Sequence, residues 1–191
     1  MLSAVTLKTG RVAPGVPTRI ELSAAVQANE PRANLTISLK TRLTANPGQQ
    51  VYVLEDVGLD AKGAVADLTN LAVKASGGVT AKLRSGEFAT DRLDLAMTAT
   101  RGKENMEFRI EAPKLSVTSD RARGDKLTIL ARIAGPGSAA SVNLVLPGIE
   151  GTAQAFRSGA MTLDLELKQG DLAIKGKIAS PVSGNVKAQQ I

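Results

Sequence analysis

Hydrophobic residues recur at every second position over most of this chain, with polar residues between them. Ile20, Leu22 and Val26 alternate with charged and small polar neighbours, and a similar alternating run covers residues 33–43. Successive side chains of a β-strand point to opposite faces, so this period predicts strands with one apolar face and one polar face. We expect an all-β, mostly antiparallel fold of about a dozen strands and no amphipathic helix.

Short clusters of glycine, proline and polar residues separate these runs and predict turns. The pair Gly77-Gly78 suits a tight hairpin, where positive φ angles are required. The alternation is broken at Glu55-Asp56, so we expect an irregularity inside the strand predicted over residues 50–61. Further turns are expected at Asn46-Pro47-Gly48, Arg101-Gly102-Lys103, Arg123-Gly124-Asp125, Gly135-Pro136-Gly137 and Gln169-Gly170-Asp171.

Residues 91–191 resemble themselves after a shift of 34 positions. The shift places Leu95 on Ile129 and Ile110 on Leu144, and it carries the proline at 113 to prolines at 147 and 181. A fixed period of this size is typical of arrays of similar structural units. We therefore predict quasi-repeats of about 34 residues, with Leu95 and Ile129 on one face of the sheet and Ile110 and Leu144 on that same face.

The chain has neither cysteine nor histidine, which excludes Cys/His zinc sites and catalytic triads that use histidine as the base. Glu55-Asp56 and the pair Asp164 and Glu166 are the nearest approach to paired catalytic carboxylates. Asp164 and Glu166 share the face opposite Leu163, which we expect to be solvated, so nothing would raise either pKa. The sequence predicts no enzyme activity, no cofactor and no metal site.

The formal charge of +6 is compatible with an anionic partner, but acidic residues are interleaved with the basic ones along the strands. The chain has only three Phe, one Tyr and no Trp, so aromatic residues for base stacking are scarce. We expect no nucleic-acid partner. Arg123-Gly124-Asp125 spells an integrin-binding tripeptide, but Gly-Asp at a strand boundary is also ordinary turn chemistry.

The predicted apolar face is on the order of 1,000 Å², more than soluble monomers usually expose. Two arrangements would shield this apolar face from water. The sheet can fold onto itself as a closed β-sandwich, the interpretation that the residues alone favour. Alternatively, the sheet can curl into a groove whose aliphatic wall solvates the acyl chains of lipids.

Three stretches of the sequence carry a family pattern. They are Leu7-Lys8-Thr9-Gly10 followed by Pro14-Gly15-Val16-Pro17, and Tyr52-Val53-Leu54 continued by Glu55-Asp56-Val57-Gly58-Leu59, together with the run Met161-Thr162-Leu163-Asp164-Leu165-Glu166-Leu167. These stretches resemble the AsmA family of bacterial envelope proteins, and the resemblance covers essentially the whole chain.

The resemblance implies a large periplasmic protein, anchored in the inner membrane by an N-terminal helix, whose long β-sheet groove carries phospholipid towards the outer membrane. Residues 1–191 would then form a single β-sheet segment of a longer protein, an open β-taco-like groove. The expected ligands are phospholipid acyl chains, and membrane contact would come from segments outside this chain. Residues 1–11 themselves lack the pattern of a signal peptide. The family implies no catalytic residues.

We expect the groove to be lined by aliphatic residues of the region 91–191, with one aromatic. The predicted lining residues are Leu93, Leu95, Met97, Phe108, Ile110, Leu127, Ile129, Ile133, Val142, Leu144, Leu146, Leu163, Leu165 and Leu167. The rival function is a structural or interaction β-sandwich module of an envelope protein, with no role in lipid transfer.

Overall fold

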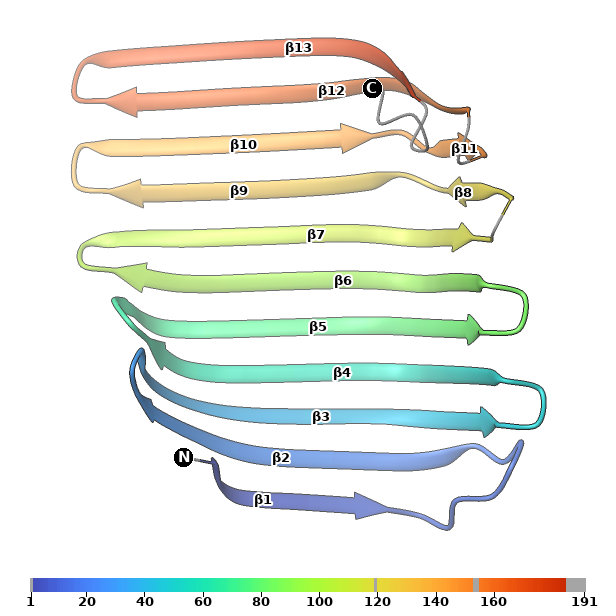
Figure 1. The fold of residues 1–191 in the computed structure, drawn as a ribbon. Helices are drawn as coiled ribbons and strands as arrows, with labels where there is room; N and C mark the ends of the chain where they lie inside the picture. The colour runs from blue at the N-terminus through green and yellow to red at the C-terminus, as the bar shows by residue number, and fades with distance from the viewer. Residues whose placement is uncertain (1, 119, 153–154, 185–191) are drawn as a thin grey trace.

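The computed structural model describes residues 2–118, 120–152 and 155–184, and folds them into one 13-stranded sheet (Figure 1). Every strand pairing is antiparallel, and the described residues contain no helix. The predicted all-β, curved and open sheet is therefore confirmed. The strands are β1 (Leu2–Thr9), β2 (Thr18–Asn29), β3 (Arg32–Asn46), β4 (Val51–Val65), β5 (Leu68–Lys82), β6 (Glu87–Arg101), β7 (Glu104–Val117), β8 (Ala122–Gly124), β9 (Leu127–Gly135), β10 (Ser138–Leu146), β11 (Ile149–Gly151), β12 (Phe156–Gln169) and β13 (Leu172–Gly184).

The strands follow one another as a simple up-and-down meander. β8 and β9 both pair with β7, so together they act as one strand that is interrupted by two residues. In the same way, β10 and β11 both pair with β12 and are separated by two residues. β1 lies at one edge of the sheet and β13 at the other (Figure 1). A 15-residue strand such as β4 is about 50 Å long, well above the usual length.

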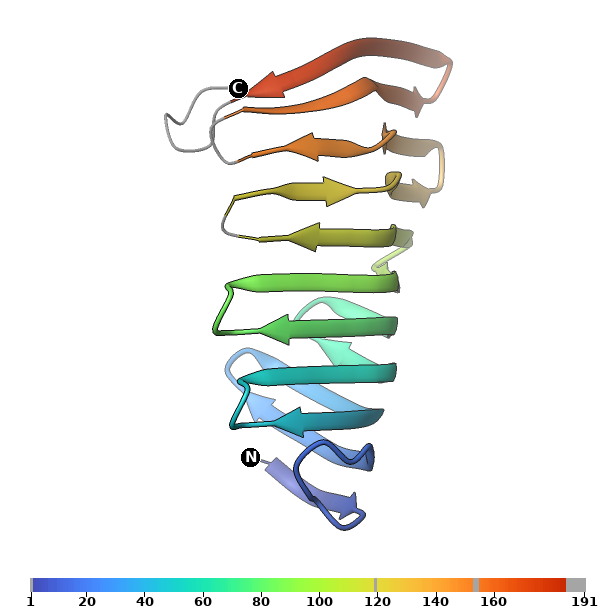
Figure 2. The same ribbon diagram turned by 90° about the vertical axis from the view of Figure 1, so that its right-hand side faces the viewer.

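A line of backbone irregularities crosses the sheet, and we call it the bend line. Asp56 of β4, Gly77 of β5 and Arg92 of β6 have φ angles of 50°, 146° and 51°, and the strand registers shift beside them. The line continues through Pro113 of β7 and the breaks β8–β9 and β10–β11, and reaches Gly159 of β12. Figure 2 shows that the strands turn along their length, which makes the sheet curved.

The bulges on this line keep the apolar residues on one face. A β-bulge adds one residue to a strand, bends it, and shifts the alternation by one position. In β4, Leu54 lies opposite Val79 and Val57 lies opposite Gly77, so β4 holds one residue more than β5 between these pairs. The extra position falls at Glu55-Asp56, which confirms the predicted irregularity there. Apolar residues return to the same face on both sides of the bend.

Two of the predicted turns are wrong. Gly77 and Gly78 lie inside β5, and the β5–β6 hairpin turns at residues 83–86 instead. A Cβ atom on Gly77 would lie 3.0 Å from the carbonyl oxygen of Arg92. Because glycine has no Cβ, the bulged backbone of β6 can lie this close to β5. Arg123 and Gly124 belong to β8, next to the bend line. The turns at Asn46-Pro47-Gly48, Arg101-Gly102-Lys103, Gly135-Pro136-Gly137 and Gln169-Gly170-Asp171 are confirmed.

The 34-residue repeat is not confirmed as a structural unit. Pro113 and Pro147 both lie on the bend line, and Pro181 pairs with Ala160 beside it. However, β7 is continuous where the corresponding segment is split into β10 and β11. Leu95 and Ile129 do share a face, as predicted, but the alternation of one continuous sheet is sufficient to explain that.

Gly63 of β4 provides a test of the close backbone packing within this sheet. Its φ is 147°, and a Cβ on it would lie 1.9 Å from the carbonyl oxygen of Asn34. We expect Gly63→Ala to lower the free energy of unfolding by about 1–3 kcal/mol or more, because the clash adds to the strain of this backbone region.

Gly58→Ala is the matched control on the same strand, because its Cβ would come no closer than 4.0 Å to the carbonyl oxygen of Lys40. Alanine costs less backbone entropy than glycine in a strand, so this variant should be neutral or slightly stabilising. Urea denaturation of both variants measures the difference in stability. Equal midpoints would show that the backbone of Asn34 does not lie as close to Gly63 as described.

Candidate functional site

An unbroken row of apolar side chains crosses the whole sheet from edge to edge. Each member lies directly opposite the next in the register of adjacent strands, and we call this the central row. Its members in order are Leu7, Leu22, Leu39, Leu59, Ala75, Leu95, Ile110, Ile129, Leu144, Leu163 and Ile178. The face of the sheet that carries the central row is the apolar face.

The structure places all fourteen predicted lining residues on the apolar face. Leu95, Ile110, Ile129, Leu144 and Leu163 belong to the central row itself. A parallel row on one side joins Met97, Phe108, Val142 and Leu165 through Ala131. The remaining members lie in the flanking rows of the same strands: Leu93, Leu127, Ile133, Leu146 and Leu167.

The prediction missed the half of the apolar face that β1 to β5 contribute. Leu22 pairs with Leu39, Leu39 with Leu59, and Leu59 with Ala75, which lies opposite Leu95. The signal was present in the sequence, because residues 20–26 and 33–43 alternate as regularly as the later strands. Only the register shows that both halves form one surface.

Nothing in the described part of the chain covers the apolar face. Ala99, 4% exposed, is the one hydrophobic residue there that is buried, while Leu165 and Leu167 are exposed and Leu95 is partly exposed. The chain exposes 12501 Å², whereas a compact monomer of this mass would expose about 8,600 Å². The closed β-sandwich is therefore wrong as the fold: the described residues form one sheet, and no second sheet of described residues packs on it.

Small side chains occupy the apolar face where it crosses the bend line. Thr41 of β3 is 7% exposed and its hydroxyl donates a hydrogen bond to the carbonyl oxygen of Glu55, at 3.0 Å. Gly77 and Thr90 follow on β5 and β6, and the hydroxyl oxygen of Thr90 is buried without a hydrogen-bond partner. Large apolar residues remain beside them, since Val57 lies opposite Gly77 and Val79 lies opposite Thr90.

The opposite face is polar, and ion pairs between exposed side chains cross it. Arg109 of β7 contacts Asp94 of β6 at 3.0 Å and Glu111 at 2.9 Å. The hydrogen bond to Asp94, followed by the charges of both carboxylates, raises the pKa of Arg109. Surface pairs of this kind contribute little stability, so the polar face is solvated and not a second core.

The acidic pairs singled out in the sequence are parts of this polar face. Glu166 pairs with Lys175 at 2.9 Å and Asp164 with Lys177 at 3.6 Å, between β12 and β13. The described residues contain no cluster of acidic side chains that could hold a metal ion. Arg123-Gly124-Asp125 crosses the bend line within the sheet, where Gly124 pairs with Leu115 and Ile149, and is not presented on a hairpin tip.

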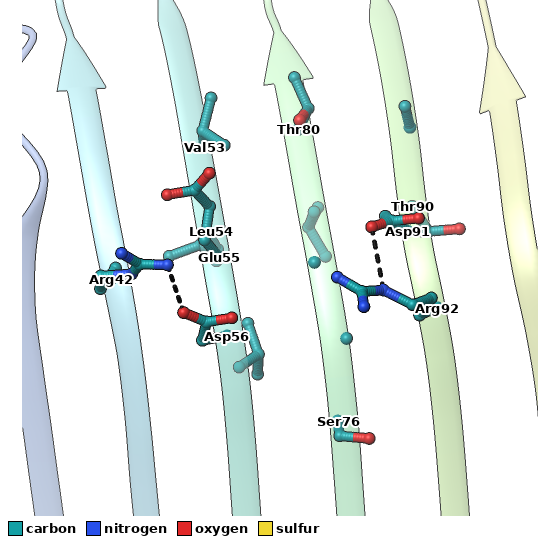
Figure 3. A pocket seen from close by; sticks show the side chains of 15 residues that line it. Arg42, Val53, Leu54, Glu55, Asp56, Ser76, Thr80, Thr90, Asp91 and Arg92 are labelled. Atoms are coloured by element: carbon teal, nitrogen blue, oxygen red, sulfur yellow. Dashed lines mark hydrogen bonds and ion pairs between the residues drawn. The ribbon is translucent and has the colours of Figure 1, made fainter.

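A polar hollow of about 610 Å³ lies on the bend line between β3 and β6 (Figure 3). Arg42 of β3 points to Asp56 of β4 on one side, and Arg92 of β6 points to Asp91 on the other. Both cations are already paired with carboxylates, so the hollow carries no net charge from these four groups. Glu55 lines the hollow as well and adds one negative charge.

Comparisons with protein-family models, with curated proteins and with solved structures found no match to this chain. The described residues include no helix that is long and apolar enough to cross a membrane. The candidate functional site therefore rests on the geometry alone, and that geometry is an extended, aliphatic and uncovered sheet face.

An uncovered apolar face should be detectable in solution. We expect the folded, delipidated protein to bind a dye that fluoresces on apolar surfaces, such as anilinonaphthalene sulfonate, and a dodecyl detergent to displace it. The measurement is dye fluorescence together with far-ultraviolet circular dichroism, which reports whether the strands stay folded. A folded protein without dye binding would mean that the apolar face is covered in solution.

The Lys175–Glu166 pair predicts a small pH dependence. A hydrogen bond from Lys175 to Glu166, followed by the attraction of that carboxylate, raises the lysine pKa above its ordinary value of 10.5. A raised pKa stabilises the folded state at pH values below 10.5, and this contribution disappears as the pH rises through the folded-state pKa. Glu166→Gln should return the pKa of Lys175 towards 10.5, as measured by NMR titration, and an unchanged pKa would contradict the pairing.

Proposed function

We propose that this chain is a segment of a lipid-transfer groove, in which the apolar face holds the acyl chains of phospholipids. The central row is the observation that carries this proposal. A continuous apolar path from one sheet edge to the other allows a chain to slide from strand to strand without leaving an apolar surface. Burial of each methylene on such a surface is worth about 0.8 kcal/mol.

The chemistry of the apolar face suits fluid acyl chains. Most of its residues are Leu, Ile, Val and Ala. Phe108 is the one aromatic among the predicted lining residues, and Tyr52 and Phe88 lie on the same face at either side of Ala81. Aromatic and polar groups at fixed positions usually give a small-molecule site its specificity. The scarcity of both favours a ligand that is recognised by its apolar length and not by its shape.

The polar face supports the same proposal, because a groove in an aqueous compartment needs a solvated exterior. Ion pairs such as Arg109–Asp94 and Arg132–Glu107 provide it. We further propose that the headgroups remain in water along the rims, where exposed lysine and arginine side chains can meet anionic lipids. By analogy with the AsmA family, the compartment is the periplasm, and inner-membrane attachment is provided by an N-terminal anchor outside this chain.

Native mass spectrometry after gentle purification tests the proposal directly. We expect phospholipid to copurify with the protein and to be lost after organic extraction. A protein that carries no lipid when it is expressed in a bacterial envelope would favour the rival, a structural or interaction module that only spaces other parts of a longer protein.

Ile129→Asp tests whether the apolar face is the binding surface. Ile129 lies in the central row between Ile110 and Leu144 and is partly exposed, so water can reach the new carboxylate. We expect the variant to stay folded, with a loss of at most about 2 kcal/mol, and to lose most of its bound lipid. Thermal melting and lipid extraction are the two measurements.

Leu130→Asp is the matched control, one residue further along the same strand and on the polar face. Leu130 lies opposite Arg109, which can pair with the new carboxylate. This variant should retain its lipid. An equal loss of lipid from both variants, or unfolding of Ile129→Asp without a separable lipid defect, would count against the proposed function.

A further inference from the structure

The loops that join β1 to β2, β3 to β4 and β5 to β6 lie side by side along one rim of the sheet (Figure 1). They comprise residues 10–17, 47–50 and 83–86, and we call them the apolar rim. The backbone N–H of Gly15 donates to the carbonyl oxygen of Ala45 at 2.9 Å, and that of Leu83 donates to the carbonyl oxygen of Gln50 at 2.9 Å. Because each bond reaches the neighbouring hairpin, the three loops form one continuous surface.

The apolar rim exposes large aliphatic side chains although its longest loop is held in a fixed shape. Val12 is 62% exposed, Val16 50% and Leu83 51%. The hydroxyl of Thr18, a buried residue, donates a hydrogen bond to the carbonyl oxygen of Arg11 at 3.0 Å, which fixes the β1–β2 loop at its base. The loop is therefore held by polar contacts and still leaves both valines in water.

The apolar rim carries positive charge and no negative charge. Its three loops contain Arg11 and Arg84 but neither aspartate nor glutamate. Both arginines are exposed, and neither has a carboxylate partner among the described residues. Arg84 instead donates a hydrogen bond to the carbonyl oxygen of Gly48 at 3.3 Å. Both cations are thus available to an anionic partner.

The opposite rim of the sheet has neither property. Its turns, at residues 30–31, 66–67, 102–103, 136–137 and 170–171, contain no Val, Leu, Ile or aromatic residue. Their charged residues are Glu30, Asp67, Lys103 and Asp171, an excess of negative charge. Both rims consist of solvent-exposed hairpin ends, so exposure by itself does not account for the valines and leucine of the apolar rim.

We propose that the apolar rim docks on the surface of an anionic lipid bilayer. Val12, Val16 and Leu83 enter the boundary between headgroups and acyl chains, while Arg11 and Arg84 contact lipid phosphates. Apolar side chains combined with basic ones are typical of segments that bind at the membrane interface. This contact is additional to the anchor proposed outside this chain, and it does not depend on lipid transfer.

The chemistry of the apolar rim favours a bilayer over a protein partner. Protein interfaces are usually centred on anchors, often aromatic, that fill a pocket, but the three loops contain no aromatic residue. Their aliphatic side chains come from two separate loops, and a fluid bilayer accepts these without a matching shape. The net charge of +6 further attracts the whole chain to an anionic surface.

Vesicle flotation with the full chain tests the docking. We expect binding to vesicles of equal parts phosphatidylcholine and phosphatidylglycerol, and weaker binding to pure phosphatidylcholine, because arginines are attracted to an anionic surface. Leu83→Asp should weaken binding by about tenfold or more, because a charge replaces a leucine that the bilayer buries. Pro136→Asp is the matched control, which adds the same charge to a turn of the opposite rim and should lose much less. Equal losses from both variants would overturn the proposal, as would no binding to the anionic vesicles, which would leave a protein as the partner of this rim.

An environment-sensitive fluorescent label shows which part of the chain enters the bilayer. The chain has no cysteine, so Leu83→Cys and Pro136→Cys can each carry one dye. We expect the emission to shift to the blue on anionic vesicles at position 83 and not at position 136. Ile129→Asp should still bind these vesicles even though it loses its bound lipid, so the two proposals fail separately. Vesicle binding that is lost in Ile129→Asp but kept in Leu83→Asp would overturn the docking proposal, since contact would then occur through the apolar face.

Discussion

Each interior strand of this protein is held chiefly by the strands on either side of it, because residues 2–118, 120–152 and 155–184 place no second layer on the sheet. Stability must come from backbone ladders and from cross-strand side-chain pairs, each of which is worth about 0.2–1 kcal/mol. The central row is the longest such set of pairs, with Leu22, Leu39 and Leu59 on consecutive strands and Leu144 and Leu163 further along. The structure resembles a one-dimensional stack, in which each strand depends on its immediate neighbours.

This dependence explains why the register is so strictly kept across the bend. A slip of one residue would move every apolar side chain to the polar face. The bulge at Glu55-Asp56 and the one at Arg92 bend their strands and still return apolar residues to the original face. Gly77 lies between these two bulges, where a larger residue would contact the backbone of β6.

The same absence of a core gives the molecule its candidate function. Enzyme sites generally rely on buried groups with shifted pKa values, and the shifts seen at Arg109 and Lys175 come from exposed ion pairs. The fold instead provides two large surfaces. One is the apolar face, which water solvates poorly, and the other is the polar face, which water solvates well. The proposed binding role rests on the first of these faces, which the described part of the chain leaves uncovered.

The sequence by itself determined the strands, their two faces and most of the hairpins, because alternation and turn residues are local signals. It also identified the fourteen residues predicted to line the groove as one apolar set, although it overlooked the contribution of β1 to β5 to the same face. Whether the sheet closes was decided only by the tertiary structure, since a sandwich core and an open groove have the same alternation. The role of Gly77-Gly78 was also undecidable locally: glycine with positive φ serves a hairpin and a bulge equally well, and only the neighbouring backbone of Arg92 distinguishes the two.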